Sequence, residues 1–127
     1  MGEGLLALVG VGRNDGQKQA QELAHKLVHL RVFLDENGRM NRSLIETGGQ
    51  LGVVSQFTLF GDARRGRRPS YTDAAPPEQA EPLIRAVIAA AGAAGVSVIA
   101  GRFRAMMDVE LLNAGPVTIL LDTDKTF

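Results

Sequence analysis

The segment that most restricts how this chain can fold is the apolar run Gln50–Phe60. It is rich in β-forming side chains, which predicts a strand in the middle of a sheet. Three hydrogen-bonding side chains, Ser55, Gln56 and Thr58, interrupt it. An unpaired buried polar group costs about 1–3 kcal/mol, so a central strand needs a reason to carry them. Either the strand ends there in solvent, or backbone N–H groups and hydroxyls converge there on a substrate carbonyl.

Two stretches with helical spacing flank this run. The first follows Asn14-Asp15, a helix-capping pair, and its apolar positions recur from Ala20 to Val28, so we expect a helix that ends near Leu30. The second begins at Pro76-Pro77, and glycines after Ala91 mark its end.

Short apolar runs elsewhere predict further strands. They are Gly4–Val11, Arg31–Leu34, Val96–Ile99, Met107–Leu112 and Val117–Leu121. Strands and helices do not alternate strictly along the chain. This order favours an α/β fold with a mixed, mainly antiparallel sheet packed by two helices, in one domain spanning residues 1–127.

Composition excludes several classes of function. The chain has 127 residues and a formal net charge of +0, so any nucleic-acid contact must be local rather than a broad basic face. Cysteine is absent, which excludes disulfides and thiolate catalysis. No apolar run has the length that spans a bilayer, and Leu5–Val11 lacks the features of a signal peptide. We therefore expect a cytoplasmic protein with no membrane partner.

Three short patterns each allow two interpretations. Gly10-Val11-Gly12, with Asp35 further on, imitates a dinucleotide-binding turn, but a glycine turn before a helix explains it better. His25 and His29 are spaced to share a metal ion, but two partly solvated helix residues are the better interpretation. Arg64-Arg65-Gly66-Arg67-Arg68 is either a solvated loop or a clamp for phosphates.

A final motif is Asn113-Ala114-Gly115-Pro116-Val117-Thr118, where Gly-Pro requires a turn, either an ordinary hairpin turn or one with a cis peptide bond. Together with Ser55-Gln56-Phe57-Thr58-Leu59, it resembles the two signatures of the D-aminoacyl-tRNA deacylase family. Gly66–Tyr71, Gly101–Phe103 and Phe33–Asn41 also match that family's pattern. The resemblance runs from about Gly4 to Leu121.

The resemblance implies a barrel-like sheet, a homodimer and sites at the subunit interface, with no cofactor and no metal. The resemblance implies a catalytic segment, Ser55-Gln56-Phe57-Thr58, at which the tRNA 3′ end would bind. Backbone N–H groups near Gln56, Phe57 and Thr58 would hold the oxyanion there. Attack would come from Thr58 or from water assisted by the ribose 2′-hydroxyl. The family's cis Gly-Pro bond corresponds to Gly115–Pro116, which would reach into the partner's pocket and exclude L-side chains while admitting glycine. Other substrate-binding residues implied are Met40, Phe103, Arg67 and Arg68.

One departure concerns the start of the chain. Family members usually open with a further strand and hairpin before the segment that matches Gly4-Leu5-Leu6. We expect its absence to expose a sheet edge. The alternative function is therefore a tRNA-binding or dimerising module without catalysis.

Overall fold

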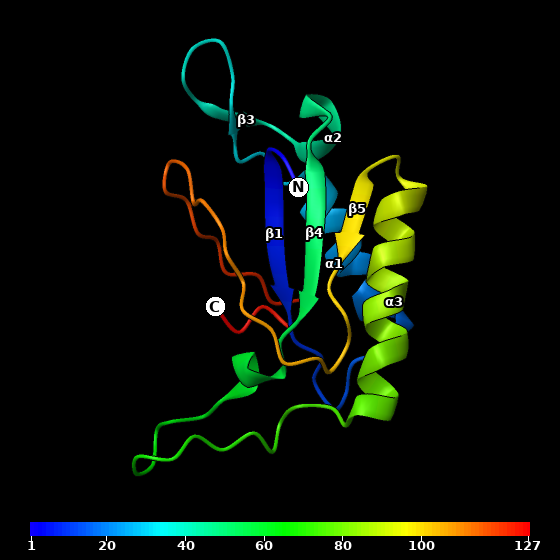
Figure 1. The fold of residues 1–127 in the computed structure, drawn as a ribbon, viewed down its shortest axis with the longest axis vertical. Coiled ribbons are helices and arrows are strands. Elements are labelled where there is room, and N and C mark those ends of the chain that lie inside the picture. Colours follow the sequence, from blue (N-terminus) through cyan, green and yellow to red (C-terminus); the bar gives the residue numbers. More distant parts are fainter.

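The computed structural model describes all residues 1–127. Its elements in chain order are β1 (Gly4–Val9), α1 (Gln17–His29), β2 (Phe33–Leu34), β3 (Met40–Arg42), α2 (Leu44–Thr47), β4 (Gln50–Ser55), the 3-10 helix η1 (Phe57–Phe60), α3 (Pro77–Ala93) and β5 (Ser97–Ala100). Figure 1 shows β4 between β1 and β5, with the small β2–β3 hairpin beyond one end of the sheet. No helix is long and apolar enough to cross a membrane.

The main sheet is parallel, with strand order β1-β4-β5. Leu51 of β4 lies opposite Leu5 of β1 on one side and Val98 of β5 on the other. Only β2 and β3 pair in antiparallel fashion. The prediction of a mainly antiparallel sheet is therefore wrong, and no closed sheet is found, although the α/β class is confirmed. The physical reason lies in the order of elements along the chain, in which α1 comes between β1 and β4, and α3 between β4 and β5. Each helix returns the chain to the end of the sheet where the previous strand began, so the next strand runs in the same direction.

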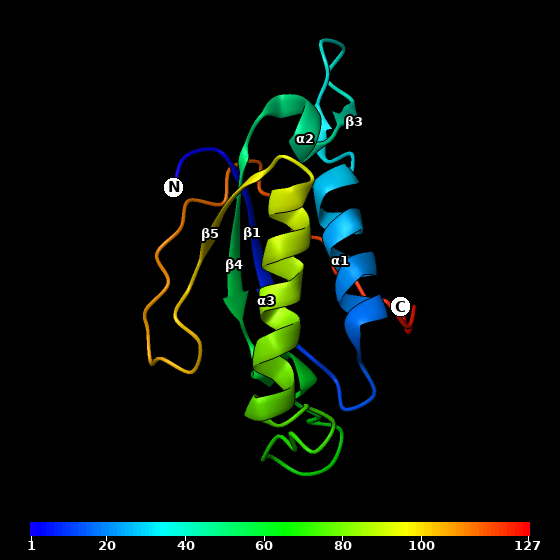
Figure 2. The ribbon, with the colours of Figure 1, turned by 90° about the vertical axis from the view of Figure 1, so that its right-hand side faces the viewer.

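Both long helices cover the same face of the sheet (Figure 2), and the core lies between them and the strands. Burial alternates along β1, as expected for a strand of which only one face contacts the core. Val9 is buried and Leu5 packs against the core, whereas Leu6 and Leu8 point away and are exposed. The opposite face of the sheet is thus apolar and largely uncovered.

The predicted helices are confirmed, with small shifts at their ends. In α1 the cap is Gly16, because the Asp15 carboxylate instead accepts a hydrogen bond from the Gly12 N–H at 2.8 Å. The short α2 was not expected from the sequence. Ser43 begins it, and a reciprocal pair of hydrogen bonds with Glu46 caps it.

Two predicted strands are absent. Met107–Leu112 and Val117–Leu121 have no regular structure, and most of their apolar side chains are exposed. A segment with strand-forming composition becomes a strand only where it pairs with a neighbouring strand. Neither segment pairs with the free edge of β1 or of β5. Both edges of the parallel sheet are therefore unpaired.

Candidate active site

The predicted central strand ends earlier than its composition indicates. The Gln56 N–H still donates to Val9 O at 2.8 Å, which continues the pairing of β1 with β4 by one residue. The chain then turns into η1, where the Leu59 N–H donates to Gln56 O and the Gly61 N–H to Thr58 O. The polar residues Ser55, Gln56 and Thr58 therefore mark the carboxyl end of β4, and Phe57 and Thr58 are exposed beyond it.

This turn leaves two adjacent backbone donors free. Neither the Phe57 N–H nor the Thr58 N–H has a hydrogen-bond partner in the structure, as expected for the first residues of a helical turn. The Gln56 N–H is occupied by Val9 O, so it cannot serve as the third donor that the family resemblance implies. The Gln56 side-chain amide donates to the Thr58 hydroxyl at 2.5 Å. The segment thus presents two N–H groups and one hydroxyl to solvent.

The turn after β1 holds η1 in place through an aromatic ring. A Cβ added at Gly10 would lie 2.9 Å from Phe60 Cε2, and one at Gly12 would lie 3.2 Å from Phe60 Cζ. The ring of Phe60 therefore packs directly on this glycine turn. Close aromatic packing accounts for both glycines, so the dinucleotide-binding interpretation has no structural support.

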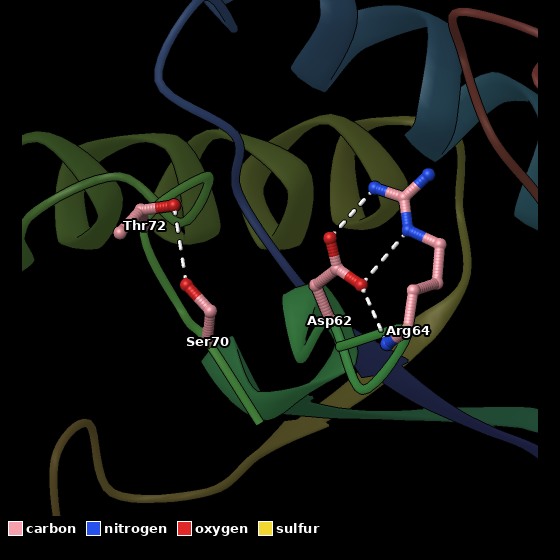
Figure 3. A network of polar contacts seen from close by, with 4 residues as sticks. All are labelled: Asp62, Arg64, Ser70 and Thr72. Carbon is pink, nitrogen blue, oxygen red and sulfur yellow. Dashed lines mark hydrogen bonds and ion pairs between the residues drawn. The ribbon is translucent and has the colours of Figure 1, made fainter. Parts of the chain in front are cut away.

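The arginine-containing loop follows η1 and returns beside it. Its return brings the ring of Tyr71 edge-on to the ring of Phe57, with centroids 5.4 Å apart. Within the loop, Arg64 binds the Asp62 carboxylate through Nε at 2.9 Å and Nη2 at 2.6 Å (Figure 3). The hydrogen bonds from the Arg64 side chain and backbone lower the pKa of Asp62 to about 2. This ion pair was not predicted from the sequence.

The other predicted site residues lie outside η1. Met40 is exposed on β3, near the opposite end of β4 from η1 (Figure 1). Phe103 is half-buried and packs against the core. Gly115 and Pro116 lie in an exposed turn. The side-chain amide of Asn113, before the turn, donates a hydrogen bond to the hydroxyl of Thr118, after it. Within one chain, Met40 therefore lies away from η1, and no hydrogen bond joins the Gly115–Pro116 turn to η1.

The Gly115–Pro116 peptide bond is trans, since the structure contains no cis peptide. The cis bond implied by the family resemblance is a prediction that the structure contradicts. A trans X-Pro bond is favoured by about 0.5–1 kcal/mol unless surrounding contacts select the other isomer. The turn is exposed on all its residues, so this chain supplies no such contacts.

A polar hollow of about 510 Å³ is lined by no residue of η1. It lies among the end of α1, the β2–β3 hairpin and α2, and both arginines and carboxylates line it. No predicted site residue takes part in it. The rings of His25 and His29 lie with centroids 4.3 Å apart and tilted by 44°, and no group of three potential metal ligands includes them.

These features define an α/β protein whose exposed, hydrogen-bonding segment lies at the carboxyl end of a central parallel strand. The family model described as D-Tyr-tRNA(Tyr) deacylase matches residues 1–122. Proteins named D-aminoacyl-tRNA deacylase are similar over nearly the whole chain. The one from Symbiobacterium thermophilum is 55% identical over 127 residues, covering 100% of this chain and 84% of the relative. The one from Roseiflexus sp. is 56% identical over 123 residues, covering 97% and 79%.

Two solved structures share the fold. One, named c-Myc DNA Unwinding Element Binding Protein, superposes with a TM-score of 0.88 at 33% identity, covering 96% of this chain and 83% of that one. The other, described as a probable eukaryotic D-amino acid tRNA deacylase, gives a TM-score of 0.61 at 16% identity over 78% and 73%. The chain belongs to the D-aminoacyl-tRNA deacylase family, a family of hydrolases.

Proposed function

We propose that η1 is where this chain hydrolyses the ester bond of D-aminoacyl-tRNA, releasing the D-amino acid and tRNA. Family membership supports the reaction. The observation that carries the site is the pair of free N–H groups of Phe57 and Thr58. Two adjacent, exposed donors fit the oxygen of an ester carbonyl, which becomes negatively charged when the carbonyl is attacked. Their removal should therefore slow the reaction more than it weakens binding.

In this proposal a water molecule attacks the carbonyl carbon. The ester bond to the ribose oxygen then breaks, and that oxygen takes up a proton. The Thr58 hydroxyl accepts a hydrogen bond from Gln56, and no histidine, lysine or carboxylate contacts it that could remove its proton. Activation by the ribose 2′-hydroxyl of the substrate is therefore favoured over a covalent intermediate on Thr58. Each backbone donor contributes about 2.7–4 kcal/mol to the transition state.

We propose that a second copy of the chain completes the site. The support is the uncovered apolar face of the sheet, because large exposed apolar surfaces mark protein contacts. Exposed side chains on the strands and on the segment after β5 include Leu6, Leu8, Ile99, Met106, Leu111, Leu112 and Leu120. In the dimer, Met40, Phe103 and the Gly115–Pro116 turn of one copy bind the aminoacyl end at the other copy's η1. Arg67 and Arg68 bind the tRNA nearby.

Chirality is read by exclusion in this proposal. Gly115 has a φ of 127°, which a residue with a side chain rarely adopts, so the turn favours glycine at this position. Its carbonyl groups occupy the place of an L-side chain, and glycyl-tRNA is accepted because it has no side chain. Gly115→Ala should reduce the preference for D- over L-tyrosyl-tRNA. An unchanged preference in a folded variant would count against this role.

A pair of substitutions isolates the Phe57 donor. Phe57→Pro removes both the ring and the N–H, whereas Phe57→Ala removes only the ring. Proline is tolerated at the first position of a helical turn, which Phe57 occupies in η1. Hydrolysis of D-tyrosyl-tRNA by the proline variant should have a kcat about 10²–10³-fold below that of the alanine variant. Equal rates would refute the donor.

The first assay compares D-tyrosyl-tRNA with L-tyrosyl-tRNA as substrates of the purified 127-residue chain. Hydrolysis of the D-ester alone supports the proposal, and we expect this activity in the cytoplasm, where aminoacyl-tRNA is used. Tight binding of tRNA without hydrolysis would instead select the non-catalytic module. The family comparisons favour the enzyme.

A further inference from the structure

The loop between η1 and α3 is closed at its base. Asp62 and Ser70 exchange two backbone hydrogen bonds, of 2.7 and 2.8 Å. On one side the loop continues directly from η1, since the Gly61 N–H donates to Thr58 O at 2.9 Å. On the other side Tyr71 packs on Phe57. Whatever the loop binds is therefore held at a fixed position relative to the candidate active site.

Arg64 differs from the other arginines of this loop. The Asp62 carboxylate accepts the Arg64 backbone N–H at 3.0 Å as well as two hydrogen bonds from its guanidinium (Figure 3). This bidentate pair uses both carboxylate oxygens and neutralises both charges. Arg64 is thereby held in the turn by Asp62, whose carboxylate offsets its charge.

The remaining arginines are free. Arg65, Arg67 and Arg68 form no ion pair with any carboxylate in the chain. Arg65 and Arg68 line a hollow of about 450 Å³ together with Asp62, Arg64 and Ser70, and none of the lining residues is apolar. Arg67 does not line it. Two guanidinium groups without an ion pair therefore line one polar hollow in the loop that follows η1, in a chain whose net charge is zero.

We propose that Arg65 and Arg68 bind a backbone phosphate of the RNA strand whose 3′ end occupies η1, and that the Asp62–Arg64 pair positions them. The planar guanidinium fork matches phosphate oxygens, and a pair of them forms a strong, salt-sensitive site. A phosphodiester is the anion that a strand leading to η1 brings to this hollow. The inference rests on the proposed function, because that function places the RNA end.

Two substrates separate this inference from the proposed function. D-Tyrosyl-tRNA carries backbone phosphates, whereas D-tyrosyl-adenosine has the same ester and ribose without any phosphate. Arg65→Gln/Arg68→Gln should raise KM for the tRNA about 10-fold or more at moderate salt and leave kcat/KM for the adenosine ester unchanged. The dependence of log kcat/KM on log salt should flatten by about 0.7 for each phosphate that the variant no longer binds. Arg85→Gln is the matched control, because Arg85 is an exposed arginine on α3, paired with Glu81.

Asp62→Asn tests the positioning role. It removes a negative charge beside the hollow, so charge alone predicts a lower KM for tRNA. Positioning predicts the opposite, a higher KM with unchanged kcat, because Arg64 is released and the turn loses its shape. A lower KM in Asp62→Asn would overturn the role of Asp62.

The phosphate site itself is overturned by either of two results in the double variant. Equal losses on both substrates would mean that the arginines support η1 rather than bind phosphate, and unchanged kinetics on both would mean that they bind nothing. If the wild-type chain hydrolysed neither substrate, the proposed function itself would be refuted. This outcome can be told apart from the two results above, because those are seen in the double variant while the wild-type chain is active.

Discussion

Gly10→Ala tests whether Phe60 fixes the candidate active site. The added methyl group would lie 2.9 Å from Phe60 Cε2 and 3.1 Å from Cδ2, whereas carbon atoms pack best at about 3.5–4.0 Å. It would also lie 3.3 Å from the backbone oxygen of Gln56, which precedes η1. Ring and turn must therefore move by several tenths of an ångström. Overpacking of this kind costs roughly 1–3 kcal/mol.

For a chain of 127 residues, each kcal/mol corresponds to roughly 4 °C in Tm, so Gly10→Ala should lower Tm by roughly 4–12 °C. Thermal unfolding at one fixed protein concentration measures this shift. Gly92→Ala is the control, because no heavy atom lies within 4 Å of an added Cβ and the position is helical. Its Tm should stay constant or rise slightly.

A double-mutant cycle with Phe60→Leu shows whether the ring is responsible. If the ring is responsible, the destabilisation by Gly10→Ala should be smaller in the Phe60→Leu background by more than about 0.5 kcal/mol, because the effects of sites that do not interact add to within that amount. The displaced η1 should also lower kcat for D-tyrosyl-tRNA in Gly10→Ala alone. The same destabilisation in both backgrounds would refute the packing argument.

The ion pair between Asp62 and Arg64 should weaken in acid, because the pKa of Asp62 in the folded chain is about 2, below the ordinary 3.8. The stabilisation that the pair contributes is therefore present above about pH 4 and is lost as the pH falls towards 2. An NMR titration of the carboxyl carbon should give this midpoint, and Arg64→Gln should raise it towards 3.8. Ser43→Ala should cost about 1 kcal/mol in urea unfolding, whereas Glu46→Gln, which preserves the capping box, should cost less. Leu51→Ala should cost about 2–5 kcal/mol in the same assay, since Leu51 is fully buried, and a cost below 1 kcal/mol would contradict its position in the core.

The helices could be predicted because their signals are local. Apolar spacing and a proline start place α3, and Gly95, with a φ of 96°, follows it as the glycine pattern predicted. The start of α1 was less exact, since Asp15 caps the preceding turn rather than the helix. α2 was missed because four residues are too few to show a periodic pattern, although Ser43 and Glu46 at capping-box spacing are a signal that could have revealed it.

Strand pairing could not be predicted in the same way. The β-forming composition of Gln50–Phe60 extends through η1, and only the pairing with β1 limits the strand to Ser55. Met107–Leu112 and Val117–Leu121 have strand composition but no partner in this chain. Because strand propensity reflects the neighbours that a segment packs against, composition alone could give neither the parallel direction nor the number of strands.

The candidate site was predicted in part for a related reason. Of the two interpretations of these polar residues, the end of a strand is confirmed at Ser55, whereas Gln56 and Thr58 lie beyond β4 and their catalytic role stays a prediction. Which backbone donors are free depends on pairing, so the sequence could not show that the Gln56 N–H is bound by Val9 O. The Asp62–Arg64 ion pair was not predicted, because the four arginines were interpreted together as one charged run. Asp62, two residues before Arg64, is nevertheless a local signal for it.

The glycine turn and the arginine loop have one structural role in common. Sequence patterns associated each of them with a ligand, a dinucleotide for Gly10–Gly12 and a phosphate for the arginine run. In the structure Phe60 packs on the glycine turn, and Tyr71, which follows the loop, packs on Phe57, so the two segments hold η1 from its two ends. Exposed donors can stabilise a transition state only if they do not reorganise during the reaction. The glycines are therefore best explained as supports of η1, and of the two segments only the loop has unpaired charges for a ligand.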